Sequence, residues 1–171
     1  MKPIRLFIIT ITATVLTSIS AVHAQETATA TATATIVTPI SITKTVDMNF
    51  GNVAVQSTTA GTVVLTPAGV RSATGGVTLP ATAGTVTAAT FTVEGEGSYT
   101  YSITLPSSAL TITDGTNTMT VGTFTSTPSA TGTLSSGTQT LKVGATLNVG
   151  AAQHSGVYTS TTPFDVTVNY N

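Results

Sequence analysis

Few residues in this chain could take part in acid–base, nucleophilic or metal chemistry. Two carboxylates lie two positions apart in VEGEGS, at Glu94 and Glu96. Paired carboxylates hydrolyse glycosidic bonds when they flank a bound sugar at a set separation. Such a cleft also needs aromatic rings for the sugar, and the chain has no tryptophan. The pair is therefore better interpreted as the polar tip of a turn.

The remaining reactive side chains lack partners in the sequence. His154 lies beside Ser155 in AAQHSG, but a zinc site or a Ser–His–Asp triad requires further ligands or partners, and the chain has no cysteine. Asp114 and Asn117, in DGTN, could offer oxygen ligands to Ca²⁺. The same letters are typical of a tight turn, since these residues tolerate positive φ. We expect no enzyme activity, no cofactor and no metal.

Three tyrosines could instead form a sugar-binding surface. Tyr99 and Tyr101 share the parity of Ile103 along an expected strand, whereas Tyr158 lies in a separate segment. Aromatic rings at alternating strand positions usually fill or border the core. We therefore expect at least Tyr99 and Tyr101 to belong to the core.

The N-terminus has the layout of a secretory signal peptide. Lys2 and Arg5 precede an apolar run over 6–16, and small residues end at Ala24. This order predicts a signal peptide over 1–24 and export through the Sec pathway to the periplasm, the cell surface or the exterior. The run is about half of the roughly 20 residues that a spanning helix needs. We expect no membrane span after cleavage.

Charge is scarce in the chain that remains. Its only bases are Lys44, Arg71 and Lys142, against six acidic residues. Nucleic-acid binding depends on clustered lysine and arginine side chains that release counterions. We therefore expect nucleic acid and anionic membrane surfaces to be poor partners. Without cysteine the chain has no disulfide, and its stability must come from burial and backbone pairing. Threonine and valine, both frequent, favour β-structure.

Apolar and polar residues alternate along most of the chain. From residue 28 to 50 the even positions are mostly apolar and the odd ones mostly polar, which is typical of half-buried strands. Pro39 interrupts this pattern and marks an edge, a bulge or a break. We divide the chain into a strand-like segment over 25–38 and a single domain over 39–171. The residues that could pair with a sheet edge or exchange between molecules are Ala28, Ala30, Ala32, Ala34 and Ile36.

Short strands follow one another to the end of the chain. Residues 84–106 and 110–124 are each expected to form a hairpin, the second around Asp114-Gly115. Residues 137–150 and 156–171 alternate in the same way, and no stretch has helical periodicity. We predict an all-β fold, an antiparallel immunoglobulin-like Greek-key sandwich of about eight strands without significant helix after the signal peptide.

The chain resembles a family of secreted bacterial proteins known as domain of unknown function 4402. The resemblance rests on ATATATIVTPISITKT, MNFGNVAV, ATGGVTLP, GTVTAATFTVEGEGSYTYSITLP, TLKVGATLNVG and GVYTSTTPFDVTVNY. It implies export and an immunoglobulin-like sandwich. MNFGNV and GVYTSTTPFDVTVNY are also distantly similar to spore-coat-protein-U-type and chaperone–usher pilin domains, in which an incomplete sandwich accepts a strand from the next subunit. Such pilins often carry a disulfide, which this chain lacks.

Two interpretations of the alanine–threonine stretch remain. It could be a donor strand for a neighbouring molecule, or it could lead into the domain's own first strand over 36–46. Alanine fills only shallow pockets, since each buried methyl contributes about 0.8 kcal/mol, which favours the second interpretation. We expect a non-enzymatic structural or surface protein. The more specific hypothesis is a pilin-like subunit that pairs with other copies of itself in an oligomer or fibre. The alternative is a monomeric adhesin-like module whose loops, 67–76 and 94–98, recognise a glycan or a surface protein.

Overall fold

The computed structural model describes residues 25–171, so the predicted signal peptide over 1–24 lies outside the described residues. Every regular element of the described chain is a β-strand, which confirms the all-β fold class. No helix in this part of the chain could cross a membrane. In order the strands are β1 (Ser41–Val46), β2 (Ala54–Val55), β3 (Gly61–Leu65), β4 (Arg71–Gly75), β5 (Val77–Thr78), β6 (Ala89–Glu94), β7 (Thr100–Thr104), β8 (Leu110–Thr113), β9 (Thr118–Thr127), β10 (Thr131–Thr133), β11 (Thr138–Val149), β12 (Thr159–Ser160) and β13 (Thr167–Tyr170).

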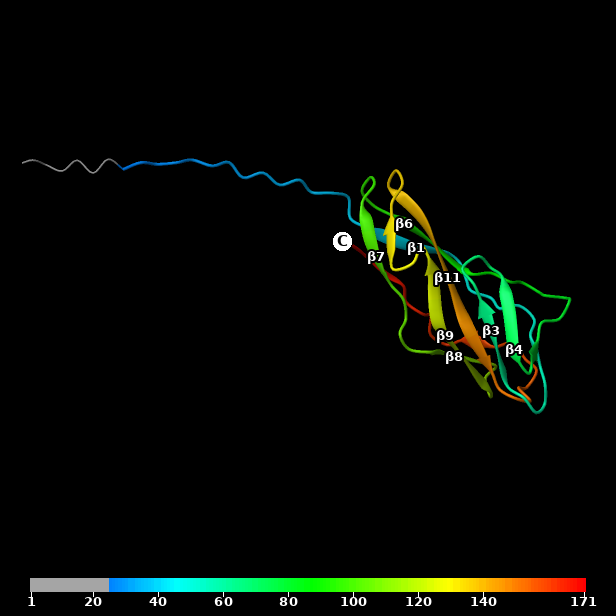
Figure 1. The fold of residues 1–171 in the computed structure, drawn as a ribbon. Coiled ribbons are helices and arrows are strands. Elements are labelled where there is room, and N and C mark those ends of the chain that lie inside the picture. The colour runs from blue at the N-terminus through cyan, green and yellow to red at the C-terminus, as the bar shows by residue number, and fades with distance from the viewer. Residues whose placement is uncertain (1–24) are drawn as a thin grey trace, which may run out of the picture. The chain divides into compact units, whose positions relative to one another are not determined.

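The strands form an antiparallel sandwich around the long strand β11. The larger sheet has the order β1-β6-β11-β9-β8-β12, and β3 with β4 branches from β11. The first half of β11 pairs with β6 and the second half with β3, so these two strands follow each other along one edge of β11 (Figure 1). The smaller sheets are β10-β7-β13 and β2-β5.

Strand β11 provides one face of the core along its whole length. Its buried residues alternate with threonine, lysine and asparagine, as the sequence predicts. One group of buried side chains packs between β6, β11, β7 and β13, and a second packs around β3, β9 and the far end of β11. The buried side chains of β11 are Leu141, Val143, Ala145, Leu147 and Val149.

One of the two expected hairpins is present and the other is wrong. Strands β8 and β9 pair directly from Leu110 with Val121 to Thr113 with Thr118. Residues 84–106 do not form a hairpin, because β6 pairs with β1 and β11 whereas β7 pairs with β10 and β13. The turn after Glu94 instead carries the chain from one sheet to the other. The alternation in both strands is retained, since their apolar faces meet across the core.

The first strand of the domain begins later than the alternation suggests. The strand expected over 36–46 starts at Ser41, two residues after Pro39, so proline marks a break between segments. Ile40 and Ile42 are half-buried against the core. Ile36 is 91% exposed, and Val37 is half-buried in its place, so the apolar parity shifts before the proline.

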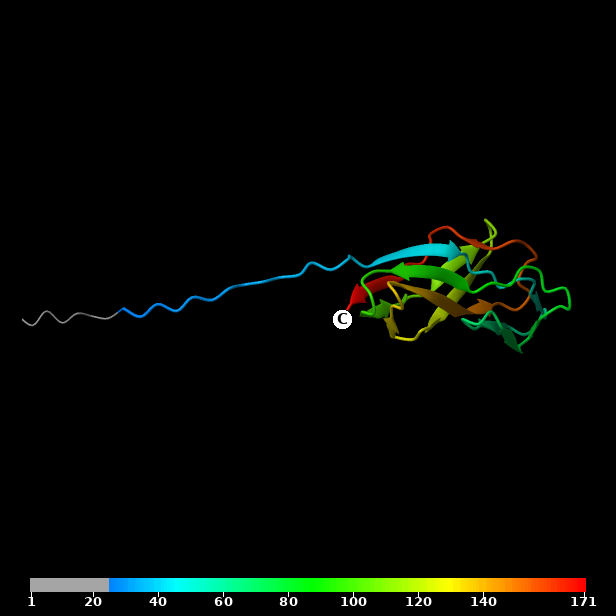
Figure 2. The same cartoon turned by 90° about the horizontal axis from the view of Figure 1, so that it is seen from above.

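The chain divides into two units, and the boundary between them lies between Thr35 and Ile36. In the first unit, residues 25–35 contain neither strand nor helix, and every one of them is exposed. The second unit, from Ile36 to Asn171, contains the whole sandwich. The start of β1 and the end of β13 lie at the same end of this unit (Figure 2).

Candidate interaction site at the root of the N-terminal segment

Three residues that are distant in sequence meet where the N-terminal segment enters the domain. Thr38 lies just before β1, Glu96 lies in the turn between β6 and β7, and Tyr170 lies in β13. We call these three residues the anchor cluster. Because β6 belongs to the larger sheet and β13 to a smaller one, the cluster joins both layers of the sandwich to the chain segment before β1.

Side chains satisfy both backbone groups of Thr38. Its N–H donates to Glu96 Oε2 at 3.0 Å, and its hydroxyl donates to the same oxygen at 2.8 Å. The Tyr170 hydroxyl donates to the carbonyl oxygen of Thr38 at 2.8 Å and accepts from the backbone N–H of Glu96 at 2.6 Å. The backbone N–H and carbonyl of Thr38 therefore bond to side chains, whereas in a sheet they would bond to a neighbouring strand. These bonds fix the position of Thr38.

The two bonds from Thr38 stabilise the charged form of Glu96. The backbone N–H of Thr38, and after it the hydroxyl, lower the pKa of the Glu96 carboxyl from its ordinary value. The turn residue predicted from VEGEGS thus has a specific partner 58 positions earlier. Glu94 is exposed at the end of β6 and takes no part in the anchor cluster, so the two carboxylates do not act as a pair.

Two strands near the cluster pair on one side only. Strand β1 pairs with β6 and β13 pairs with β7, and the two strands contact each other without pairing. Edge strands of monomers are commonly protected by charge, proline or bulges. In β1, Lys44 and an irregularity before Val46 provide such protection. Strand β13, TVNY, contains neither charge nor proline.

The predicted pairing residues lie in or beside the first unit. Ala28, Ala30, Ala32 and Ala34 are exposed and belong to no strand. Ile36, the largest of the set, is the first residue of the second unit and its side chain is almost fully exposed. Full burial of such a side chain contributes roughly 1.5–3 kcal/mol.

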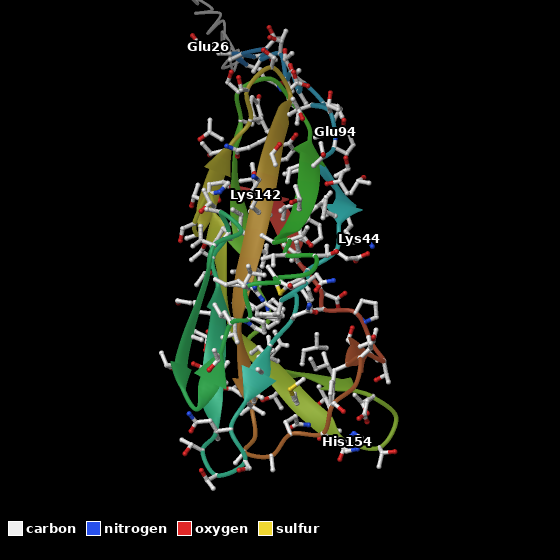
Figure 3. The ribbon with its side chains drawn as sticks, turned by 90° about the vertical axis from the view of Figure 1, so that its right-hand side faces the viewer. Glu26, Lys44, Glu94, Lys142 and His154 are labelled. Atoms are coloured by element: carbon white, nitrogen blue, oxygen red, sulfur yellow. The ribbon has the colours of Figure 1, made fainter. Side chains whose placement is uncertain are left out.

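Among residues 25–171 the charged groups do not gather into one binding surface. Lys142 lies on the outer face of β11, Lys44 on β1 and Glu94 at the end of β6, while His154 lies at the opposite end of the domain (Figure 3). Lys44 is bonded to Asp47 at 2.6 Å. Arg71 donates to the backbone carbonyls of Phe50 and Asn52, so it fixes a loop. Within residues 25–171 no three potential metal ligands lie together.

The far end of the domain brings His154 close to the Asp114 turn. Asp114 accepts from the backbone N–H and the side-chain amide of Asn117 and from the backbone N–H of Thr116, and these bonds hold its pKa well below the usual range. The His154 Nδ1 atom is 3.9 Å from Asp114 Oδ2. An open pocket of about 550 Å³ lies between these loops, with Ser155 in its lining.

The tyrosines differ in their roles. Tyr101 is fully buried and donates to Gln139 Oε1 at 2.7 Å, and burial raises its pKa. Tyr99 is half-exposed, and its ring stands edge-on to that of Tyr170 with centroids 5.6 Å apart. Tyr158 donates to the carbonyl of His154. Of the two expected core residues only Tyr101 is buried, since Tyr99 precedes the strand.

Sequence reasoning missed the anchor cluster because its bonds cross more than fifty residues. The only local signals were Pro39, which marked the break beside Thr38, and the glycines that flank Glu96.

Compared with known proteins, the chain matches no curated protein and no solved structure. A family model described as Domain of unknown function (DUF4402) matches residues 40–170. Since this match spans most of the sequence, the chain belongs to the DUF4402 family.

Proposed function

We propose that the protein is an exported, non-enzymatic structural subunit that associates with further copies by β-strand addition. Residues 28–36 would be the added strand. The observation that carries the proposal is the unpaired edge of β13, which has neither charge nor proline, together with the exposed, alternating segment in the same chain. An added strand gains affinity from backbone hydrogen bonds and specificity from every second side chain.

The side chains of the segment suit a supporting rather than a dominant role in binding. Each alanine methyl contributes only about 0.8 kcal/mol on burial, whereas an isoleucine contributes roughly 1.5–3 kcal/mol. Ile36 would therefore be the main apolar contact, and the alanines would let the strand approach closely. Most of the binding would come from the backbone, which explains how a sequence of so little variety could still pair.

The first test compares the chain that starts at Gln25 with one that starts at Ile36. Light scattering over a range of concentrations measures the mass of each. We expect the longer chain to form assemblies and the shorter one to stay monomeric with an unchanged melting temperature. The proposal fails if the longer chain is a monomer throughout and the shorter chain behaves identically.

A second test locates the accepting edge. Because the chain has no cysteine, single cysteines report contacts without background. Copies with Ala32→Cys are mixed with copies carrying Asn169→Cys, on the exposed side of β13. We expect disulfide-linked heterodimers under mild oxidation. Thr74→Cys, which is also exposed on β4, is the control and should cross-link much less. Equal yields for both sites would exclude β13 as the acceptor.

The second candidate function is a monomeric binding module, and one observation favours a particular surface for it. The loops first expected to carry contacts are less suitable, because 71–75 is strand β4 and Glu96 is engaged by Thr38. The pocket between the Asp114 turn and His154 is open and combines amide, carboxylate, imidazole and hydroxyl groups. A glycan array would support this function if Asn117→Ala abolished a hit, and an array without hits would count against it.

A further inference from the structure

We propose that Thr38, Glu96 and Tyr170 form a load-sharing anchor, which passes a pull on the N-terminal segment into both sheets of the sandwich. The use of such an anchor rests on the proposed function, since only a segment held by a neighbouring copy is under tension. Its existence does not, because the contacts lie within one chain and can be measured on single molecules.

The pairing of β1 shows why an anchor matters. Strand β1 pairs with β6 alone. A pull on Ile36 that reached β1 directly would be carried by the backbone bonds between β1 and β6 alone. In the chain, Thr38 of the anchor cluster lies before β1. The force therefore reaches Thr38 first, where Glu96 leads it to the turn after β6 and Tyr170 leads it to β13.

The surroundings hold both partners of Thr38 in place. A Cβ atom on Gly95 would overlap the Tyr170 hydroxyl, so only glycine allows the tyrosine to reach the turn. The N–H of Gly95 donates to the carbonyl of Gly137 at 2.9 Å, and the N–H of Gly137 donates to that of Gly97 at 2.8 Å. The Tyr99 ring packs against the Tyr170 ring. The anchor is thus braced by the turn between β10 and β11 as well as by β13.

The experiment pulls single chains through two different points of attachment. One handle is placed at Ile36→Cys, outside the anchor, and in a second chain it is placed at Ser41→Cys, inside it. Both positions are exposed. The opposite handle is Ser72→Cys on the exposed side of β4 in the larger sheet. We expect a higher peak unfolding force through position 36 than through position 41, because only the first path loads the anchor.

Tyr170→Phe then tests the assignment. It keeps the ring that packs on Tyr99 but removes the hydroxyl that bonds to Thr38 and Glu96. We expect the force through position 36 to fall part of the way toward that of position 41, because the two bonds from Thr38 to Glu96 remain. The force through position 41 itself should stay constant. A merely structural role would lower both forces equally, and that result would overturn the proposal. Equal forces through the two handles in the unsubstituted chain would overturn it as well.

Variants of the carboxylates separate the anchor from general effects of charge. Glu96→Ala should reduce the difference between the handles to what the bond from Tyr170 to Thr38 carries, and Glu96→Gln should restore part of the loss, because an amide oxygen can still accept from Thr38. Glu94→Ala removes a carboxylate two residues away and should leave the difference intact. If Glu94→Ala and Glu96→Ala act alike, the anchor is refuted. A chain that stays monomeric in light scattering but retains the difference would refute only the proposed assembly.

Discussion

The segment over 28–35 and strand β11 have the same two-residue period but different structures. Both alternate apolar residues with threonine or other polar residues. Strand β11 is the centre of the larger sheet, whereas residues 28–35 are exposed and form no strand. The difference lies in the apolar side chains, which are leucine and valine in β11 and alanine in the segment. Period alone indicates that a chain can be a strand, and side-chain volume decides whether burial can hold it there.

The variant with the largest expected effect replaces a leucine of β11 by alanine, the apolar residue of the segment. Leu141→Ala removes a fully buried side chain at the contact between β11 and β6. We expect the free energy of unfolding in urea to fall by about 2–5 kcal/mol, from lost transfer free energy and the cavity left behind. Thr140→Ala, next to it but exposed, should change the value by less than about 0.5 kcal/mol. Similar losses for both variants would show that volume on the core face is not what holds β11.

A smaller loss of stability should follow from a substitution in the turn between β8 and β9. Strand β9 is the other neighbour of β11. The pKa of Asp114 is lowered in the folded state, so its stabilisation is present above the unfolded-state pKa near 3.9. It is lost as the pH falls below that value. Asp114→Asn should therefore be less stable than the original chain at pH 7, with the difference shrinking toward pH 2. Urea unfolding at a series of pH values measures this, and a difference that grows in acid would contradict it.

The smallest effect on domain stability should come from the reverse exchange, in which the segment receives the side chains of β11. Ala30→Val with Ala32→Val should change the free energy of unfolding of the monomer by less than about 0.5 kcal/mol. If these residues enter a partner's sheet, each added methyl contributes about 0.8 kcal/mol, and association should strengthen by at least about tenfold. A dilution series in sedimentation velocity measures the association. Thr31→Val, on the other face, is the control, and an equal gain there would argue against strand addition.

What the sequence could predict depended on how local the cause was. The hairpin of β8 and β9 follows from Asp114 and Gly115 between two alternating runs, and the structure confirms it. The face of β11 follows from its own period. The predicted hairpin over 84–106 is wrong because Val93 and Tyr101 lie in different sheets and pack in the same core cluster. Alternation cannot distinguish this arrangement from pairing within one sheet. Thr38, Glu96 and Tyr170 were not found together, since nothing near any of them indicates the other two.

The position of β11 in the chain also sets the order in which the protein can form. Strands β1, β3, β6 and β9 must pair directly or through a neighbour with a strand that ends at Val149. The hairpins β3–β4 and β8–β9 are local, but the layer that joins them is incomplete until most of the polypeptide has been synthesised. Pairing over such separations is slow. The larger sheet can therefore be completed only near the end of synthesis, after β11 has been added to the chain.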